Sequence, residues 1–267
     1  MHVLALDFDG VICNSICETF ATAIHTYAGF VSDSRLVSRI ETRLGAWPWT
    51  ATAIDTDPDF ARFAELVPLG NRAEDFGVAL LAMDIEVPMA DQQAYDAFYG
   101  SLDADWLARF HRRFYESRAT LRDAAPEAWL ALHTDYPRFT ELLHRIAGDI
   151  TLAVATAKDG ASLGLLLDRF GLSGLFRDEL RLDKETGVQK TEHLSRLSER
   201  LDVPFATITF VDDKVNHLTK VAPLGVRPVL AGWGHNTDRE RETARAFGFQ
   251  VADLGNAHQI LMPAEGA

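Results

Sequence analysis

The chain opens on an apolar run, Val3 to Leu6 followed by Phe8, that predicts a strand buried on both faces. Similar runs recur in the second half of the sequence, and segments with apolar residues at helical spacing lie between them. The later strands are predicted at residues 150–155, 179–182, 207–211, 226–230 and 250–253. The helices between them are predicted at residues 138–147, 163–170, 191–201, 215–221 and 238–247. Repeated strand–helix units predict an α/β fold: a Rossmann-like, doubly wound parallel sheet with helices on both faces.

The middle of the chain carries a different pattern, in which apolar residues follow helical spacing and no strand is convincing. A helix predicted over residues 12–27 leads into this region. Further helices are predicted near residues 33–44, 58–67, 70–82, 91–100, 104–119 and 124–132. We therefore expect two domains: an α/β core of residues 1–14 and 135–267, and an all-helical domain of residues 15–134 inserted into it.

Composition narrows the class of protein further. Apolar residues make up 47% and charged residues 24% of the 267 positions, as in ordinary globular proteins. The net charge of -13, without a long Lys/Arg run, argues against a nucleic-acid partner. No apolar run reaches the roughly 20 residues that span a bilayer, and the first strand begins at residue 3. We therefore expect no membrane segment, no signal peptide and a cytoplasmic location. The oligomeric state stays open between monomer and homodimer.

The cysteines give no sign of a disulfide or a zinc site. Only Cys13 and Cys17 are present, four residues apart on the predicted first helix. A zinc site requires more ligands, and two cysteines within one helical turn have poor geometry for a disulfide. Both are therefore expected to be small core residues.

Polar residues follow several predicted strands at the point where each strand ends. They are Asp7 and Asp9, Thr156, Lys190 at the head of a helix, and Asp212 with Asp213. Because the carboxyl ends of parallel strands meet at one edge of a sheet, we expect these side chains to converge. Clustered carboxylates repel one another and need a cation, and an all-oxygen set suits Mg²⁺. Adding a hydroxyl and an ammonium makes a receptor for a phosphoryl group, in which one carboxylate can act as nucleophile and its neighbour can move protons.

These residues, in this order, resemble the four motifs of the haloacid dehalogenase (HAD) superfamily. The matching segments are Asp7-Phe8-Asp9-Gly10-Val11, Thr156 after an apolar strand, Lys190, and Val211-Asp212-Asp213 followed by Asn216. Together with Gly232-Trp233-Gly234-His235-Asn236-Thr237, the wider pattern is similar to phosphoglycolate-phosphatase-like members. The resemblance covers residues 1–14 and about 135–235, and it implies that the helical insertion is the cap domain of this superfamily.

The resemblance implies roles for the four carboxylates. Asp7 would be the nucleophile and a Mg²⁺ ligand. Asp9 would be the general acid/base and would offer its backbone carbonyl to the metal. Asp213, with Asp212 beside it, would complete the Mg²⁺ site. Some relatives carry a further acid where this chain has Asn216 and His217, which would lower metal affinity.

The resemblance also implies how the phosphoryl group is bound. Thr156 would bind it through its hydroxyl, and Lys190 would steady the charge of the nucleophile and the phosphate. Lys184 is an alternative to Lys190, which is preferred because it leads a helix. The stretch Thr156-Ala157-Lys158 would line the phosphate site, but Ala157 stands where many relatives carry Asn, so one phosphate contact would be missing there or would be supplied by Lys158.

Substrate contacts are also expected from the cap, because a cap closes over the cleft in this superfamily. The candidates are Arg39, Arg43, Glu41, Trp47 and Trp49, in a stretch broken by Gly and Pro. The alternative is that the tryptophans are core residues and the arginines lie on a solvated helix face.

Asp9 favours the phosphatases of the superfamily over its dehalogenases. An alkoxide leaving group needs a proton, which Asp9 can donate, whereas a halide leaving group does not. Phosphonate cleavage would use a cap lysine, and no lysine occurs between Ile12 and Tyr136. The sequence therefore predicts a Mg²⁺-dependent phosphatase acting on a small phosphorylated metabolite through an aspartyl-phosphate. The alternatives are a sugar-phosphate mutase with the same residues, or a phosphate-ligand-binding or regulatory protein that has lost turnover, for which Ala157 and Asn216 give some support.

Overall fold

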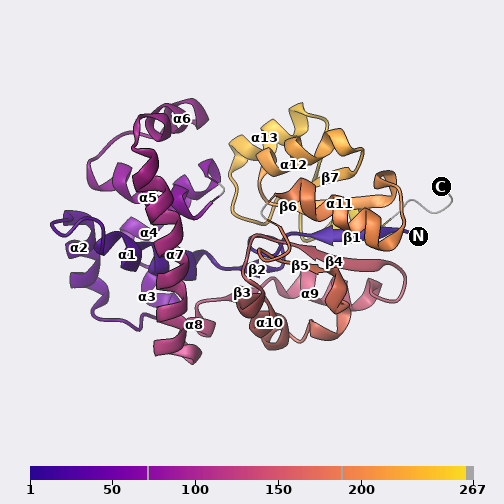
Figure 1. Ribbon diagram of the computed structural model, residues 1–267, viewed down its shortest axis with the longest axis horizontal. Coiled ribbons are helices and arrows are strands. Elements are labelled where there is room, and N and C mark those ends of the chain that lie inside the picture. The colour runs from indigo at the N-terminus through magenta and orange to yellow at the C-terminus, as the bar shows by residue number, and fades with distance from the viewer. Residues whose placement is uncertain (71, 188, 263–267) are drawn as a thin grey trace. The chain divides into compact units, whose positions relative to one another are not determined.

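The chain divides into two compact units, each with its own apolar core. The computed structural model describes residues 1–70, 72–187 and 189–262 (Figure 1). The first unit consists of Met1–Asn14 and Thr134–Ala267, and the second of Ser15–His133.

The first unit is built on a six-stranded parallel sheet with the order β5-β4-β1-β6-β7-β8. Its strands are β1 (Val3–Leu6), β4 (Thr151–Ala155), β5 (Arg181–Leu182), β6 (Ile208–Asp212), β7 (Arg227–Ala231) and β8 (Gln250–Ala252). In the centre, Leu6 of β1 pairs with Val154 on one side and Val211 on the other. The strand order reverses at β1, so the crevice that binds ligands in this kind of sheet opens at the carboxyl end of β1. The predicted fold class is confirmed.

Helices cover both faces of this sheet. Those of the first unit are α9 (Pro137–Ile146), α10 (Gly160–Arg169), α11 (Lys190–Leu201), α12 (Val215–Val221), α13 (Asp238–Ala246) and α14 (Ala257–Leu261). Short 3-10 turns lie at Ser173–Leu175, Asp178–Leu180, Phe205–Thr207 and Ala222–Leu224. Leu194 of α11 and Leu218 of α12 pack against sheet residues such as Phe210, while α9 and α10 lie on the opposite side (Figure 1). The side chain of Asp159 accepts a hydrogen bond from Ser162 N (2.9 Å) and so caps α10.

The start of the first helix differs from the prediction. Residues Cys13–Asn14 form β2, which pairs antiparallel with β3 (Thr134–Asp135), and α1 begins only at Ile16. The backbone carbonyl of Phe8 accepts hydrogen bonds from Val11, Ile12 and Cys13, and this turn prevents the helix from starting at Ile12. Cys13 is therefore on a strand rather than a helix, although both cysteines are free and buried as expected.

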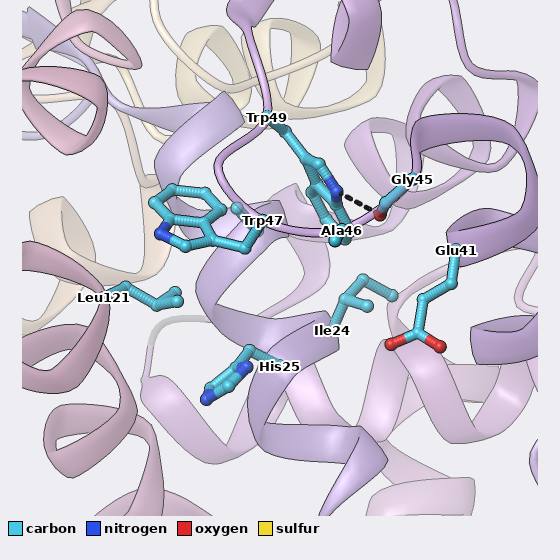
Figure 2. Close-up of a pocket in the computed structure, with 9 residues that line it drawn as sticks. Ile24, His25, Glu41, Gly45, Ala46, Trp47, Trp49 and Leu121 are labelled. Carbon is cyan, nitrogen blue, oxygen red and sulfur yellow. Dashed lines mark hydrogen bonds between the residues drawn. The ribbon is translucent and has the colours of Figure 1, made fainter. Parts of the chain in front are cut away.

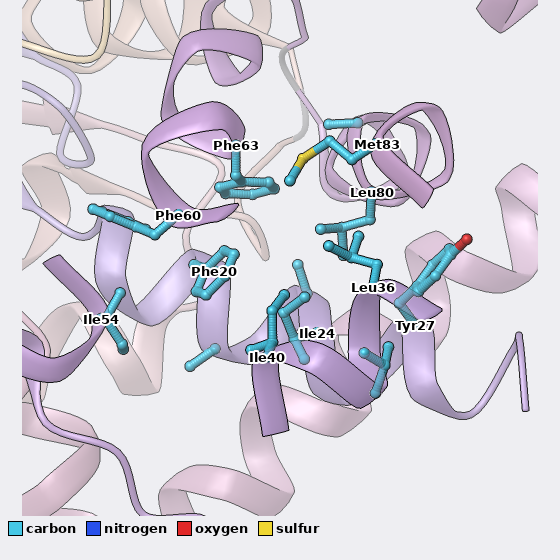
Figure 3. Close-up of a cluster of buried hydrophobic side chains, with 14 of the residues drawn as sticks. Phe20, Ile24, Tyr27, Leu36, Ile40, Ile54, Phe60, Phe63, Leu80 and Met83 are labelled. Carbon is cyan, nitrogen blue, oxygen red and sulfur yellow. The ribbon is translucent and has the colours of Figure 1, made fainter. Parts of the chain in front are cut away.

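The second unit is helical throughout its described residues. Its helices are α1 (Ile16–Ala28), α2 (Arg35–Leu44), α3 (Ala51–Asp55), α4 (Pro58–Leu66), α5 (Ala73–Asp84), α6 (Gln92–Ser101), α7 (Ala104–Ala124) and α8 (Pro126–Ala131), with a 3-10 turn at Val67–Leu69. Figure 3 shows aromatic and branched side chains from α1 to α5 converging on one core. Here Phe20 of α1 contacts Phe60 and Phe63 of α4 at ring-centroid distances of 5.4 and 5.3 Å. None of the helices in the described ranges is long and apolar enough to cross a membrane.

A buried charge lies beside this core. The carboxylate of Glu18, in α1, accepts two hydrogen bonds from Arg118 of α7 (2.8 and 3.0 Å). Thr22 Oγ1 (2.7 Å) and Trp129 Nε1 (3.2 Å) also donate to it. The Glu18 side chain is fully buried and that of Arg118 is 7% exposed, so the guanidinium and the neutral donors stabilise a carboxylate that water does not reach.

Candidate active site

Asp7 lies directly after β1, where the sheet reverses its strand order. Its backbone N–H donates to Val211 O (2.9 Å), which extends the parallel pairing of β1 with β6, and its carboxylate accepts a hydrogen bond from Phe8 N (2.7 Å). The residue is only 7% exposed. A carboxylate held by the backbone at this place is both oriented and largely shielded from water.

Lys190 is the lysine that lies beside Asp7. It is the first residue of α11, and its Nζ lies 2.7 Å from Asp7 Oδ1 and 3.5 Å from Asp212 Oδ2. The same atom donates to Ala155 O (2.8 Å) at the end of β4. The ammonium group thus connects the ends of β1, β4 and β6, and its charge is balanced by two buried carboxylates.

The carboxylates of Asp7, Asp212 and Asp213 are buried together and repel one another. Burial raises the pKa of Asp7 to about 6, against the opposing effect of Lys190 and with the help of Asp212. Burial likewise raises the pKa of Asp213 to about 8, with the negative charges of Asp212 and Asp7 adding to the shift. For Asp212, burial is outweighed by His217 and Lys190, which lower the pKa to about 2. Three buried carboxylates beside one ammonium group carry a net negative charge. Oxygen donors of this kind fit a hard divalent cation such as Mg²⁺.

The loop after β7 positions Asp213, a role of this loop that the sequence did not predict. The backbone N–H of His235 donates to Asp213 Oδ2 (2.8 Å), and Asn236 Nδ2 donates to Asp213 O (3.2 Å) and Ala231 O (2.9 Å). A Cβ at Gly234 would overlap with Asp213 Cβ and with the backbone oxygen of Gly10. In the sequence, the glycines of Gly232-Trp233-Gly234 were the sign of this packing, because a residue without a side chain lets two segments of the chain approach closely.

Asp9, Thr156 and Lys158 form a second group at the same strand ends. Lys158 Nζ lies 3.0 and 3.3 Å from the two carboxylate oxygens of Asp9. Lys158 N donates to Thr156 Oγ1 (3.2 Å), while Ala157 between them is half-buried. The Lys158 side chain is fully buried and that of Asp9 is 34% exposed. Lys158 was predicted to contact phosphate, and here its partner is Asp9.

His217 is a neighbour of Asp212 whose role the sequence did not reveal. Its Nδ1 lies 2.9 Å from Asp212 Oδ2, and Asp7, Asp212 and His217 each offer a ligand atom within 4.8 Å of the others. His217 follows Asp212 by five residues and lies in the first turns of α12. This spacing was the only sign in the sequence that His217 lies next to Asp212. In this arrangement the imidazole contacts the Asp212 carboxylate directly.

Arg39 and Arg43 belong to the helical unit and form ion pairs there. Arg39 makes two hydrogen bonds to Asp59 (2.8 and 2.7 Å). Arg43 makes two to Asp57 (2.6 and 2.9 Å) and one to Asp59 (2.5 Å). These pairs join α2 to the start of α4, and a role of either arginine in substrate binding stays a prediction.

The buried side chain of His193, close to this site, makes the stability of the protein depend on pH. It is fully buried in α11, and its Nε2–H donates to Asp183 O (3.1 Å) and Gly187 O (2.8 Å) in the loop that leads to Lys190. Among the described residues, its Nδ1 has no partner, so a second proton there would find no acceptor. Burial, assisted by the charge of Lys190, lowers the pKa of His193 from 6.5 to about 4.

The pKa of His193 is lower in the folded than in the unfolded chain, so the unfolded chain binds the proton more readily below pH 6.5. This contribution to stability is complete above that pH and is lost as the pH falls towards 4. We expect urea unfolding curves to show that the wild-type protein loses up to about 3 kcal/mol more than His193→Gln between neutral pH and pH 4. An equal loss in both proteins would contradict this role of His193.

The parallel sheet with acidic residues at its switch point puts the protein in the class of Rossmann-like α/β proteins. The chain belongs to the haloacid dehalogenase-like hydrolase family, because the sequence profile of that description matches residues 1–219. The resemblance inferred from the motifs is thereby confirmed at the level of the family.

Solved structures agree on the fold. A predicted phosphoglycolate phosphatase from Haemophilus somnus is similar with a TM-score of 0.61 and 17% identity, covering 98% of each chain. A predicted phosphatase from Clostridium acetobutylicum has a TM-score of 0.62 and 13% identity, covering 97% of each chain. At such identities the likeness shows the fold alone. A 48-residue stretch is 44% identical to oxaloacetate decarboxylase from Pseudomonas fluorescens (strain SBW25), but it spans only 18% of this chain and 17% of that protein.

Proposed function

We propose that this protein is a Mg²⁺-dependent phosphatase that hydrolyses a small phosphomonoester metabolite through an aspartyl-phosphate on Asp7. The observation that carries the proposal is the buried Asp7 carboxylate with Lys190 Nζ 2.7 Å away, at the switch point of the sheet. Phosphoryl transfer asks mainly for positioning and for neutralisation of charge, and this pair supplies both.

In the first step a carboxylate oxygen of Asp7 attacks phosphorus and the bond to the ester oxygen breaks. Asp9 in its protonated form donates its proton to the departing alkoxide. Lys190 neutralises charge on the Asp7 carboxylate and on the phosphoryl oxygens, and the Thr156 hydroxyl donates a hydrogen bond to one of them.

In the second step a water molecule attacks phosphorus, the bond to Asp7 breaks, and inorganic phosphate leaves. Asp9 takes the proton of the attacking water and is thereby ready for the next cycle. Lys158, whose Nζ contacts both carboxylate oxygens of Asp9 (3.0 and 3.3 Å), orients this group for both transfers.

Asp7, Asp213, the backbone carbonyl of Asp9 and the neighbouring Asp212 are the residues that would hold Mg²⁺. The bound cation would neutralise negative charge on the carboxylates and the phosphoryl group. The raised pKa values of Asp7 and Asp213 support this, since a cation removes the repulsion that raises them. We propose further that the helical domain, residues 15–134, is the cap that excludes bulk water during the reaction.

A screen of the purified protein over many phosphorylated metabolites with Mg²⁺ tests this function. We expect inorganic phosphate to be released from p-nitrophenyl phosphate and, faster, from one class of small monoester. Migration of phosphate between hydroxyls without net release would identify a mutase instead. Absence of turnover over the whole panel would favour a binding or regulatory role.

Gly10 offers a test of how closely the site is packed. It has a φ of +81°, and a Cβ there would overlap with the Asp213 carboxylate. We expect Gly10→Ala to lower kcat/KM for p-nitrophenyl phosphate by about 10²-fold, because Asp213 must shift.

Gly225→Ala is the matched control, since Gly225 has a φ of +88° but nothing within 4 Å of an added Cβ. Both variants carry the backbone cost of about 1–2 kcal/mol in urea unfolding. Only Gly10→Ala is expected to lose activity, and equal activity of the two variants would contradict the proposed place of Asp213.

A further inference from the structure

The helical unit contains a pocket of about 430 Å³ that has no part in the reaction proposed above. Its walls are Trp47, Trp49, Ile24 and Leu121, with His25 and Glu41 as polar members (Figure 2). The volume lies within the roughly 300–1,000 Å³ that small organic ligands occupy. Figure 2 shows the two indoles, which come from the loop between α2 and α3, facing helix α1.

The two indoles are held so that they present differently oriented faces. Their ring centroids are 6.3 Å apart and their planes make an angle of 66°. Trp49 is 7% exposed, and its Nε1 donates to Gly45 O (2.9 Å). Gly45 has a φ of +75° and turns the chain at the end of α2, which lets the loop fold back in this way. Rigid indole faces are the strongest protein partners for organic cations.

The charge of the pocket is negative. Among the described residues that line the pocket, Glu41 is the one acid, and neither Lys nor Arg is present. Arg39 and Arg43, two residues away on either side of Glu41, are bound to Asp59 and Asp57. Since those guanidinium groups already have carboxylate partners, the carboxylate of Glu41 stays open to a cation from outside the chain.

We propose that this pocket binds a small organic ammonium compound. The cationic head lies against the faces of Trp47 and Trp49 with Glu41 as counter-ion. The proposal concerns binding alone and is independent of the proposed phosphatase activity.

Choline and its uncharged carbon isostere 3,3-dimethylbutan-1-ol are the probes that test it. Binding to the full-length protein with Mg²⁺ is followed by saturation-transfer NMR and by tryptophan fluorescence. We expect choline to bind in the micromolar to low-millimolar range and the isostere to bind about tenfold more weakly, because only choline carries the charge. Equal affinities, or the lack of a saturable signal with choline, would overturn the proposal.

Variants locate the site. Trp47→Leu is expected to weaken choline binding about tenfold and Trp47→Phe less, since phenylalanine keeps an aromatic face. Glu41→Gln, at an exposed position, is expected to weaken it about fivefold, whereas Glu65→Gln on exposed α4 surface leaves it unchanged. If the Trp47→Leu protein does not fold, Glu41→Gln decides alone, and unchanged binding in it overturns the site.

A kinetic measurement tests whether this site is separate from the proposed active site. We expect saturating choline to leave hydrolysis of p-nitrophenyl phosphate unchanged, and competitive inhibition by choline would contradict a separate site.

Discussion

Replacing Asp7 by Asn is expected to lower kcat for p-nitrophenyl phosphate by about 10⁴-fold while leaving the fold intact. A carboxamide is too weak a nucleophile to form the covalent intermediate, and it also loses the ion pair with Lys190 at 2.7 Å. Stability is not expected to fall, because burial raises the pKa of Asp7 and the neutral side chain avoids that cost. Steady-state kinetics and urea unfolding measure the two effects.

Asp238→Asn makes the same chemical change on a carboxylate that is 91% exposed in the first turn of α13. That variant is expected to retain wild-type kcat. If Asp7→Asn stayed within tenfold of the wild type, another group would have to be the nucleophile.

Replacing Arg118 by Leu is expected to destabilise the protein by about 3–5 kcal/mol, because the Glu18 carboxylate would lose its charged partner in the interior. Thr22 and Trp129 would still donate to Glu18 at 2.7 and 3.2 Å, but neither carries charge. Urea unfolding measures the loss. Arg113→Leu on the same helix is the control, since Arg113 is 59% exposed and pairs at 3.5 Å with Glu116, so its effect is expected to stay within about 0.5 kcal/mol.

A second substitution separates the buried charge from lost packing. Glu18→Gln in the Arg118→Leu background removes the uncompensated charge and keeps an acceptor for Trp129. The double variant is therefore expected to be more stable than Arg118→Leu alone. If the double variant is no more stable, packing of the arginine stem rather than charge explains the loss.

The parallel sheet could be predicted because its strands are short apolar runs with few other interpretations. The chemistry of the strand ends followed, since Asp7, Thr156 and Asp212 each come directly after such a run. The start of α1 could not be predicted, because Ile12 and Ile16 have helical spacing and only pairing with Thr134–Asp135 makes Cys13–Asn14 a strand.

Contacts between distant segments could not be predicted from the sequence for the same reason. Periodicity describes one element at a time, whereas the hydrogen bond from His235 N to Asp213 spans 22 residues and the pair of Lys158 with Asp9 spans 149. The short helices α3 and α14 were not predicted, because five residues are too few to show helical periodicity.

Chemical trapping of the covalent intermediate tests the proposed reaction most directly. The protein is mixed with substrate and Mg²⁺, quenched in acid, treated with hydroxylamine and examined by peptide mass spectrometry. Hydroxylamine converts an aspartyl-phosphate to the hydroxamate, and we expect that modification at Asp7 only, and only when substrate was added. Modification at another residue, or none while phosphate is released, would contradict nucleophilic catalysis by Asp7.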